Sequence, residues 1–486
     1  MEWNKGPDSP HIDTTQAFRR LPLAEIMAHR RESRLERRLN AVDLATLGVG
    51  AIVGTGIFVL TGVAAAEYAG PGVILSFIVS GITAALAAIV YTELAAMLPA
   101  AGSAYTYAYV SLGEVIAWLV GWNLLLEYVV AASAVSIGWG GYLGDLFASF
   151  GLPLPAAWTS SPLAGGTLNV PAIVVPLTAV ALLSMGAREG ASANRLIVMV
   201  KLAAIGLFLV VGALHVNPTN WSPFLPFGAT GVIHGAAIVF FAYLGFDAVA
   251  TAAEEVQDPR RDMPRGILAS LGLSTLLYVA VAAVITGLVS YTRLDTPSPV
   301  TTALLAVCAG WATSAVALGA LAGLSSVLIV SLFALSRILF AIARDGLLPP
   351  FFTRLNERSG TPTRALWTVG LLIAALSSFL PVGTIAELAN IGTLTAFIAV
   401  AAGVLVLRRT QPAAERPFRV PWVPWLPLLS IALSFYLMLN LPRLTWIRFA
   451  VWLAAGLVIY GVYGFRHSRL RQLAAEDRET DPVHLR

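Results

Sequence analysis

Residues 44–58 read Leu44-Ala-Thr-Leu-Gly-Val-Gly-Ala-Ile-Val-Gly-Thr-Gly-Ile-Phe58. Glycine occupies four of the nine positions from 48 to 56 in this otherwise apolar segment. Because each glycine costs a helix about 1 kcal/mol relative to alanine, this density predicts a break in the helix or a close approach of neighbouring backbone. Tight packing of small residues between helices, without a break, is the alternative explanation.

A second segment, Phe240-Phe-Ala-Tyr-Leu-Gly-Phe-Asp247, shows related features. It places Gly245 and the acidic residue Asp247 in an apolar run that lies five predicted spans later. Unwound backbone inside a membrane is tolerated only where it lines a cavity or is buried in protein. At such breaks, free N–H groups suit an anion and free carbonyls suit a cation, so the pair matches a zwitterionic amino acid. The spacing predicts an inverted repeat of five helices.

The composition is that of an integral membrane protein. Of the 486 residues, 57% are hydrophobic and only 12% are charged, whereas soluble domains carry about 25% charged residues. Apolar runs of about 20 residues recur along the chain, as membrane-spanning helices require. We expect no cleavable signal peptide, because residues 1–40 lack a short apolar core. The single cysteine, Cys308, excludes an intramolecular disulfide and a multi-cysteine metal site.

The basic residues predict how the chain crosses the membrane. With the N-terminus inside, the outer loops hold Arg293, Arg443 and Arg448, and all other basic residues except Lys201 fall at the inner side. We therefore predict a multi-pass protein of the cell inner (plasma) membrane with both termini in the cytoplasm. The twelve predicted spans are about 41–66, 72–98, 115–143, 169–187, 191–216, 230–256, 266–290, 312–343, 365–381, 385–407, 424–441 and 446–465.

This pattern divides the chain into three regions. The first is a cytoplasmic tail in which Leu21 to Arg38 form a basic amphipathic stretch. The second is the twelve-helix membrane domain, and the third is a cytoplasmic C-terminal tail. Their bounds are 1–38, 39–465 and 466–486, and the membrane domain comprises a first repeat of about 41–216, a second of about 230–407 and two further helices within about 424–465.

Lys201 is the basic residue predicted to lie deepest within a span. The chain has 31 lysine and arginine residues, of which only Lys5 and Lys201 are lysine. Lys201 follows Ala191 by ten residues, which is about 15 Å along a helix. A buried lysine amine can lose its proton near neutral pH, whereas an arginine guanidinium cannot. The position predicts a functional amine; a side chain that extends to the membrane interface is the alternative.

Further charged residues fall within predicted spans. Glu127 lies near the middle of the third span, where a carboxylate is costly. We expect it to face the site and to pair with a basic side chain or an amino group; the alternative is a protonated or hydrogen-bonded packing residue. Asp247 is expected to cap the second half-helix, and Glu387 to begin a helix in solvent. Arg337 and Arg344 are expected to reach the inner interface or to make gate contacts.

Three motifs resemble the amino acid–polyamine–organocation superfamily of transporters. Gly54-Thr-Gly-Ile-Phe58 is similar to the first-helix signature of that superfamily. Glu254-Glu-Val-Gln-Asp-Pro-Arg-Arg-Asp-Met-Pro264 is similar to the inner loop after helix six, and Arg337-Ile-Leu-Phe-Ala-Ile-Ala-Arg-Asp-Gly-Leu-Leu-Pro349 to the end of helix eight. The run Trp122-Asn-Leu-Leu-Leu-Glu-Tyr128 and the lysine in helix five resemble bacterial homologues of the cationic amino acid transporters. The resemblance covers about residues 39–465.

The resemblance implies a LeuT-type fold, in which helices 1, 2, 6 and 7 move as a bundle against a scaffold of helices 3, 4, 8 and 9. It also implies substrate contacts at both breaks and on helix three, with Phe241 lying across the site as an apolar gate. The implied substrate-binding residues are Ile52, Val53, Gly54, Thr55, Gly56, Glu127, Ala131, Phe241, Ala242, Leu244 and Gly245. We add Ser331 of helix eight, where a small polar residue facing the cavity leaves room for a long side chain.

The resemblance also places the family's helix-five lysine at Lys201. In sodium-coupled relatives a cation binds there, between helices one and eight, and the Lys201 ammonium would stand in for that ion. We expect its partners to be the carbonyl of Gly48 or Val49 and the hydroxyl of Ser325 or Ser326. Protonated Lys201 would hold helix one to the scaffold, and neutral Lys201 would release it.

These features predict a proton-coupled symporter that imports small neutral L-amino acids such as alanine, and cationic ones such as arginine, by alternating access. The alternatives are an amino acid exchanger and a membrane sensor that transports nothing. An enzyme is not expected, because the sequence outside the spans has no nucleophile–base set, metal-ligand cluster or phosphate loop. We expect an amino acid substrate and membrane lipid as partners. No cofactor, metal or sodium site, nucleic acid or covalently linked heavy chain (through Cys308) is expected.

Overall fold

The computed structural model describes residues 19–21, 39–98, 103–185, 191–251, 256–258, 260–307, 310–356 and 361–472. Within these residues the chain is helical and has no strand, apart from an isolated bridge between Leu39 and Val256. The predicted all-α fold is therefore confirmed. Several features singled out in the sequence lie outside the described residues: Lys5, Cys308, most of the amphipathic stretch (22–38), residues 254, 255 and 259 of the second motif, and the tail beyond residue 472.

Long helices make up most of the chain and are joined by short 3-10 and π-helical elements. In the first half these are α2 (Ala41–Ile52), η1 (Gly56–Leu60), α3 (Thr61–Ala64), η2 (Ala65–Ala69), η3 (Gly70–Gly72), α4 (Val73–Met97), α5 (Ser103–Ser111), α6 (Glu114–Ser149), α7 (Ala156–Thr159), η4 (Pro162–Ala164), α8 (Val170–Ser184) and α9 (Ala191–Ala213). In the second half they are η5 (Pro218–Trp221), α10 (Gly228–Val239), η6 (Phe240–Tyr243), α11 (Phe246–Thr251), α12 (Asp262–Leu288), η8 (Tyr291–Arg293), α13 (Pro299–Ala306), α14 (Gly310–Arg344), η9 (Pro350–Thr353), α15 (Thr363–Phe379), α16 (Val382–Thr410), α17 (Trp425–Leu439), α18 (Arg443–Ile459), η10 (Tyr460–Gly464) and α19 (Phe465–His467).

Seven helical segments in the described part of the chain are long and apolar enough to cross a membrane. They are Gly56–Met97, Glu114–Ser149, Leu196–Ala213, Asp262–Leu288, Gly310–Arg344, Val382–Thr410 and Arg443–Gln472. Five shorter apolar helices accompany them: Ala41–Ile52, Val170–Ser184, Gly228–Tyr243, Thr363–Phe379 and Trp425–Leu439. The first and third of these shorter helices end at the two predicted interruptions. The chain is a multi-pass membrane protein.

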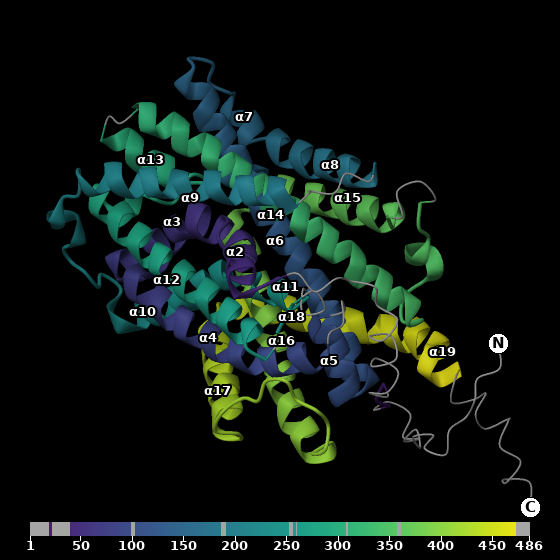
Figure 1. Ribbon diagram of the computed structural model, residues 1–486. Coiled ribbons are helices and arrows are strands. Elements are labelled where there is room, and N and C mark those ends of the chain that lie inside the picture. Colours follow the sequence, from purple (N-terminus) through teal and green to yellow (C-terminus); the bar gives the residue numbers. More distant parts are fainter. Residues whose placement is uncertain are drawn as a thin grey trace, which may run out of the picture.

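The short half-helices α2 and α11 lie in the middle of the bundle (Figure 1). α2 packs against α12, α9 and α14, and α11 contacts α2, α4 and α12. The two longest helices, α6 and α14, pack along each other beside them. Because both half-helices have ends inside the bundle, their terminal N–H and carbonyl groups must find partners within the protein or at a cavity.

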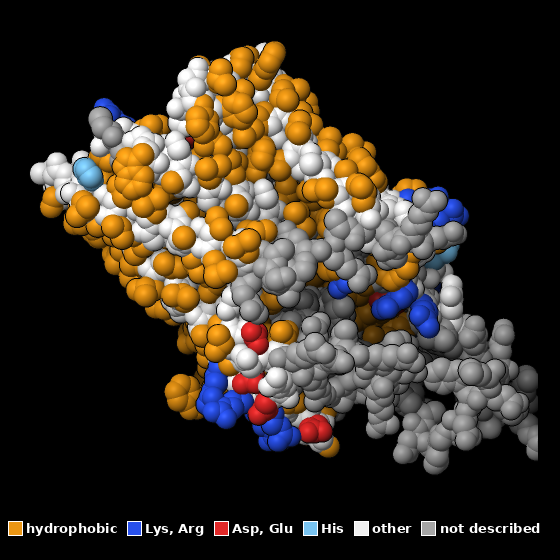
Figure 2. Space-filling model, turned by 45° about the horizontal axis from the view of Figure 1, so that its top comes forward, with side chains coloured by type: hydrophobic (Ala, Val, Ile, Leu, Met, Phe, Trp, Pro, Cys, Tyr) orange, Lys and Arg blue, Asp and Glu red, His pale blue; other side chains and the backbone are white. Residues whose placement is uncertain are grey.

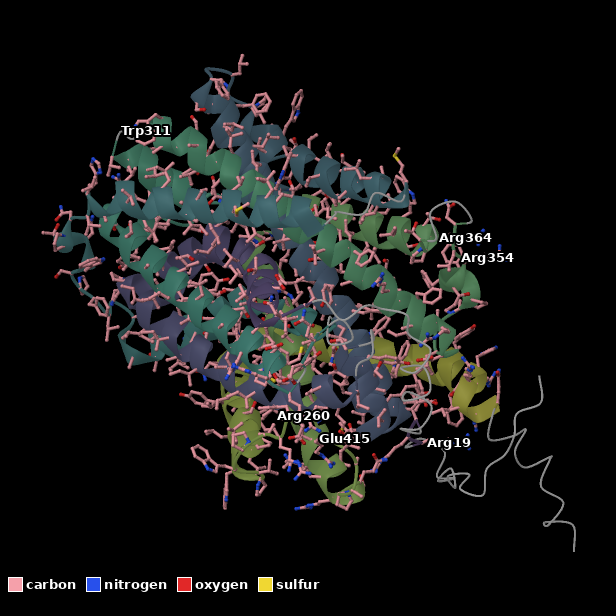
Figure 3. All side chains as sticks on the ribbon, in the orientation of Figure 1. Arg19, Arg260, Trp311, Arg354, Arg364 and Glu415 are labelled. Carbon is pink, nitrogen blue, oxygen red and sulfur yellow. The ribbon has the colours of Figure 1, made fainter. Side chains whose placement is uncertain are left out.

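The surface of the bundle visible in Figure 2 is mostly apolar, with charged side chains concentrated at one margin. Figure 2 shows hydrophobic side chains over most of the visible face, with acidic and basic side chains gathered along its lower edge. Figure 3 places Arg19, Arg260, Arg354 and Arg364 toward one side of the bundle and Trp311 at the opposite end. We call the side that carries these four arginines the basic end.

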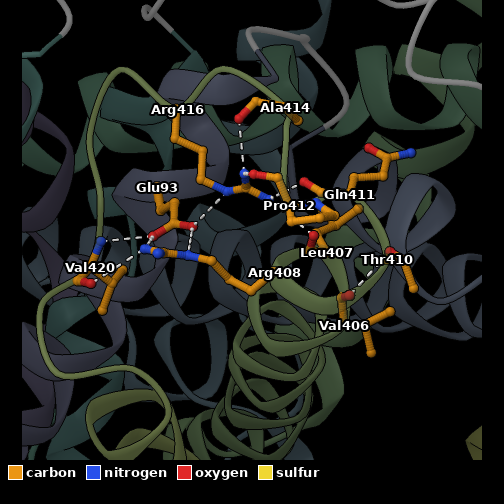
Figure 4. A network of polar contacts seen from close by, with 10 residues as sticks. All are labelled: Glu93, Val406, Leu407, Arg408, Thr410, Gln411, Pro412, Ala414, Arg416 and Val420. Atoms are coloured by element: carbon orange, nitrogen blue, oxygen red, sulfur yellow. Dashed lines mark hydrogen bonds and ion pairs between the residues drawn. The ribbon is translucent and has the colours of Figure 1, made fainter.

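At the basic end, a buried carboxylate ties α4 to α16 and to the loop that follows it (Figure 4). Arg408 donates to both oxygens of Glu93, at 2.7 and 2.6 Å, and the backbone N–H of Val420 donates to Glu93 at 2.7 Å. Arg416 lies 3.4 Å from Glu93 and donates to the Leu407 carbonyl in the last turn of α16. Arginine side chains thereby satisfy carbonyls that the helix end leaves free.

Glu93→Gln tests the importance of this network. The change leaves Arg408 and the buried Arg416 facing an uncharged amide, and removing one partner of a buried ion pair costs about 3–5 kcal/mol. We expect a clearly lower unfolding temperature of the detergent-solubilised protein, followed by tryptophan fluorescence. The matched control is Glu415→Gln, which removes an exposed 3.1 Å pair with Arg260 and should cost less than about 1 kcal/mol. Equal losses in the two variants would contradict the role given to Glu93.

Candidate functional site

The first predicted interruption separates α2 from η1. α2 ends at Ile52, the backbone of Val53 is extended, and the π-helical turn η1 begins at Gly56. The carbonyls in the last turn of α2 and the first N–H groups of the following segment therefore meet in the middle of the bundle. These are the groups that a continuous helix would have paired with each other.

The four glycines of this segment have two different roles. A Cβ added to Gly48 would lie 2.5 Å from a side chain of α12, and one added to Gly50 would lie 3.0 Å from a side chain of α9. Both glycines lie within α2 and permit close helix packing. Gly54 lies within the break and Gly56 begins η1 after it, and a Cβ on Gly56 would lie 2.2 Å from the Cβ of Ala242. Close helix packing therefore explains the first pair of glycines, and the helix break explains the second pair.

The second interruption lies between η6 and α11, at Gly245. Its φ of +104° is rarely adopted by residues with a side chain, and a Cβ there would lie 2.9 Å from the Ala51 carbonyl oxygen. Ala51 meets Gly245 at one end of the two breaks, and Gly56 meets Ala242 at the other. The breaks therefore lie side by side and run in opposite directions.

Tyr278 of α12 links the two breaks, and the sequence did not single it out. Its buried hydroxyl lies 2.8 Å from the Ile52 carbonyl oxygen and 2.7 Å from that of Ala242, and can donate to either. Tyrosine hydroxyls that are buried normally find such partners. A polar-tipped residue in the middle of an apolar span was the signal that could have identified Tyr278.

A pocket lies between the breaks and the facing helices α6 and α14. The space open to the centre of a water molecule is about 70 Å³, several times what one buried water needs. The lining residues are Ala51, Ile52, Gly54, Thr55, Gly56, Glu127, Tyr128, Ala131, Val135, Phe241, Leu244, Gly245, Val327, Val330, Ser331 and Ala334. The breaks, one face of α6 and one face of α14 thus enclose a small and mainly apolar space.

The residues predicted for the site converge on this pocket, with two exceptions. Val53 and Ala242 are buried behind the pocket wall, where their carbonyls accept hydrogen bonds from Lys201 and Tyr278. All the other predicted residues line it. Sequence reasoning did not name six residues that line the pocket. Helical spacing could have identified four of these, because Val135 is one turn beyond Ala131 and three others lie within four residues of Ser331. The missed residues are Ala51, Tyr128, Val135, Val327, Val330 and Ala334.

The pocket offers few polar side-chain groups. The Thr55 hydroxyl and the Glu127 Oε2 atom are buried and have no hydrogen-bond partner among the described residues. Thr55 directly precedes η1 and lies next to the N–H groups at its start. Buried polar groups are normally hydrogen-bonded, so these two atoms are candidates for contact with a polar ligand.

Lys201 lies behind the pocket and caps the carbonyl end of α2. It is fully buried, and its Nζ donates to the carbonyl oxygens of Gly50 and, at 2.8 Å, of Val53. The carbonyl end of a helix is its negative end, where a cation is favourable. A Cβ on Gly323 of α14 would lie 3.1 Å from the Lys201 Cβ, so this glycine leaves room for the lysine stem.

The partners expected for Lys201 need correction. Its Nζ donates to the carbonyls of Gly50 and Val53 in place of the expected Gly48 or Val49, and the Val49 carbonyl accepts the Val53 N–H at 3.0 Å. The carbonyls left free by the break lie closer to the end of α2. Of the two expected hydroxyls, that of Ser325 donates to the Leu321 carbonyl at 2.7 Å.

Away from the basic end, an apolar cluster closes the pocket. Phe241 packs there with residues of η1, α6, α8 and α16, including Leu60 and Ile385. Beyond it, Glu387 accepts hydrogen bonds from Tyr68, at 3.2 Å, and Thr445. The prediction that Glu387 lies in solvent is wrong, because only 9% of its surface is exposed and these two hydroxyls hold it.

Asp247 lies beside the pocket but not as the cap that was expected. α11 begins at Phe246, so Asp247 lies within the first helical turn rather than before it. The Tyr128 hydroxyl donates to the Asp247 carboxylate at 3.2 Å. Because Tyr128 lines the pocket, Asp247 is one hydrogen bond removed from it.

Comparison with known proteins gives consistent matches. The family model described as amino acid permease matches residues 39–463. The methylthioribose transporter of Bacillus subtilis (strain 168) is 45% identical over 94% of this chain and 99% of its own length. The branched-chain amino acid permease BcaP of the same organism is 42% identical over 94% and 99%. The vacuolar cationic amino acid transporter 4 of Arabidopsis thaliana is 40% identical over 78% of this chain and 64% of that protein.

Gly56→Ala tests whether the contact between the breaks shapes the pocket. The added methyl group would lie 2.2 Å from the Ala242 Cβ and 2.3 Å from its Cα, so the breaks must move apart. We expect loss of ligand binding, measured by thermal stabilisation with amino acids. Gly206→Ala on α9 is the control, because no other group lies within 4 Å of its added Cβ. It should be neutral or stabilise the helix by up to about 1 kcal/mol; full binding by Gly56→Ala would contradict this geometry.

Proposed function

Because the chain belongs to the amino acid permease family, we propose that it is a proton-coupled symporter that imports small neutral amino acids, such as alanine, and cationic ones, such as arginine. The matched family and relatives are transporters rather than enzymes. The permeases among them are named for amino acids as their substrates. The observation that carries the proposal is the pocket between two side-by-side helix breaks.

The polarity of the breaks supports an amino acid as the ligand. The N–H groups around Thr55 and Gly56, together with the Thr55 hydroxyl, are the proposed donors to a carboxylate. The carbonyls of Ile52 and Phe241 are the proposed acceptors for the amino group. Ile52 already accepts from Tyr278 and Phe241 from the Leu244 N–H, and each carbonyl retains a second lone pair. The apolar walls formed by Phe241 and Leu244 suit a small neutral side chain.

The arrangement of helices supports a LeuT-type fold with twelve spans. The interruptions at Gly54 and Gly245 lie five predicted spans apart, as an inverted repeat requires. In this arrangement the basic end faces the cytoplasm, where basic residues accumulate. The protein would then reside in the bacterial plasma membrane with both termini inside. Opening of the apolar cluster around Phe241 would admit substrate from the other side.

Lys201 is the proposed site of proton coupling. Its ammonium binds two carbonyls at the end of α2, between α2, α9 and α14. A neutral amine can donate fewer hydrogen bonds and carries no charge to favour the negative end of the helix. Loss of the proton would therefore weaken the hold of the scaffold on α2, which is the change that alternating access needs.

Uptake in proteoliposomes tests the proposal. Labelled alanine and labelled arginine should accumulate when an inward proton gradient is imposed together with an inside-negative membrane potential, and sodium should have no effect. Uptake that needs amino acid inside the vesicles would instead indicate exchange. Methylthioribose belongs among the competitors, because the name of a relative with 45% identity favours it as a second candidate substrate. Competition by methylthioribose without competition by any amino acid would overturn the amino acid assignment.

Lys201→Ala should abolish gradient-driven uptake, to the level of protein-free vesicles. Lys201→Arg should not restore it, since a guanidinium keeps its proton at any relevant pH. Binding without a gradient, measured by thermal stabilisation, separates lost coupling from a lost pocket. Accumulation by Lys201→Ala equal to that of the wild type would show that proton coupling lies elsewhere.

Side-chain selection is predicted to depend on Glu127 and Ser331, which face the pocket from different helices. Glu127→Gln should weaken arginine binding by about 1.5–3 kcal/mol, or roughly tenfold to a hundredfold, because a charge-assisted hydrogen bond is lost. Ser331→Met should fill the space that a long side chain needs. Alanine binding should change little in both variants. Equal losses for alanine and arginine would favour a transporter of neutral amino acids alone.

A further inference from the structure

Two buried carboxyl groups lie together at the edge of the pocket. Glu127 of α6 is 4% exposed and Asp247 of α11 is 5% exposed. Tyr128 lines the pocket beside Glu127 and donates to Asp247 at 3.2 Å. Asp247 is near enough for its charge to act on Glu127. Two carboxylates taken out of water repel each other and lose their hydration, so such a pair holds a proton unless a cation joins it.

Among the described residues, the groups that lie around Glu127 include several hydroxyls. No ion pair among the described residues includes Glu127, whose Oε2 atom has no hydrogen-bond partner. Two basic side chains of neighbouring helices have contacts of their own: Lys201 donates to carbonyls of α2, and Arg337 of α14 lies 3.9 Å from the ring centre of Phe333. The neighbouring groups around the pair are Thr393 of α16, Ser331 of α14, Tyr91 of α4, Tyr107 of α5 and Tyr128 of α6.

We propose that Glu127 carries a proton while the pocket is empty or holds a neutral amino acid, and that the charged head of a cationic amino acid displaces it. The inference rests on the proposed transport function and extends it to the charge balance of the two substrate classes. The step is balanced. The O–H bond of Glu127 breaks, its proton passes to water, and an N–H group of the substrate donates to the carboxylate instead.

This exchange has a consequence for transport. A neutral amino acid crosses while Glu127 keeps its proton, and the coupling proton is then the one net charge moved. A cationic amino acid brings one extra charge but releases one proton on the side where it binds. Glu127 takes up a proton on the other side after the substrate leaves. Alanine and arginine therefore move the same net charge per molecule, although arginine itself is charged.

Proton release on binding tests the proposal directly. Isothermal titration in two buffers with different ionisation enthalpies counts the protons exchanged per ligand bound. Arginine is compared with citrulline, which has nearly the same shape but an uncharged ureido group. We expect wild-type protein to release one more proton with arginine than with citrulline. Equal proton counts for the two ligands would overturn the proposal, and this comparison needs no variant.

Variants locate the proton. In Glu127→Gln the difference between arginine and citrulline should disappear, whereas in Lys201→Ala it should persist, because Lys201 acts on both ligands alike. Glu387→Gln is the matched control, since Glu387 is also a buried carboxylate but is held by Tyr68 and Thr445 away from the pocket. In Glu387→Gln, arginine should still release one more proton than citrulline. The assignment to Glu127 would be overturned if this difference in proton release remained in Glu127→Gln, or if it were lost only in Glu387→Gln.

Measuring the charge moved per substrate molecule completes the test. It also distinguishes failure of this proposal from failure of the proposed function. Solid-supported membrane currents, divided by labelled uptake, should give the same charge per alanine and per arginine. One more charge per arginine than per alanine would overturn the displacement of a proton. If alanine is taken up but neither arginine nor lysine binds, this proposal fails and proton-coupled import of neutral amino acids stands. If arginine displaces a proton but no amino acid is taken up, the proposed function fails instead.

Discussion

The ammonium of Lys201 on the carbonyl end of α2 is the contact on which the site depends. A helix that ends inside a membrane leaves carbonyls without partners, and neither lipid nor bulk water can supply them. The Lys201 side chain donates to those of Gly50 and Val53, at the negative end of the helix where a cation is favourable. With α2 held there, Ala51 meets Gly245. The shape of the pocket follows from that meeting.

The pocket obtains most of its polarity from backbone rather than from side chains. A broken helix presents N–H groups and carbonyls at fixed positions, because the two half-helices cannot rotate without disturbing their packing. Tyr278 strengthens this arrangement by joining the Ile52 and Ala242 carbonyls through one hydroxyl. Among the polar side chains that line the pocket, Glu127 is the one with a carboxyl group, which can distinguish a charged ligand from a neutral one.

The two ends of the bundle are held by different forces. At the basic end, Glu93 joins α4 to α16 through directed, charge-assisted bonds from Arg408. Such bonds have a defined geometry and are costly to break. Around Phe241 the contacts are apolar, and Glu387 adds hydrogen bonds to two neutral hydroxyls. Apolar contacts have no fixed direction and can slide, so this end is better suited to rearrangement.

The amino-acid order alone establishes the membrane class, both helix breaks and the unusual lysine, because glycine density, hydropathy and charge are local properties. Most of the candidate site instead follows from the resemblance to known transporters, which places substrate contacts at both breaks and on helix three. Only the tertiary structure shows that Gly48 packs while Gly56 flanks a break, that Tyr278 joins both breaks, and that Glu387 is buried. Those outcomes depend on which face of each helix packs against which neighbouring helix. This packing is determined by contacts between residues that lie up to hundreds of positions apart, so a local sequence pattern does not predict it.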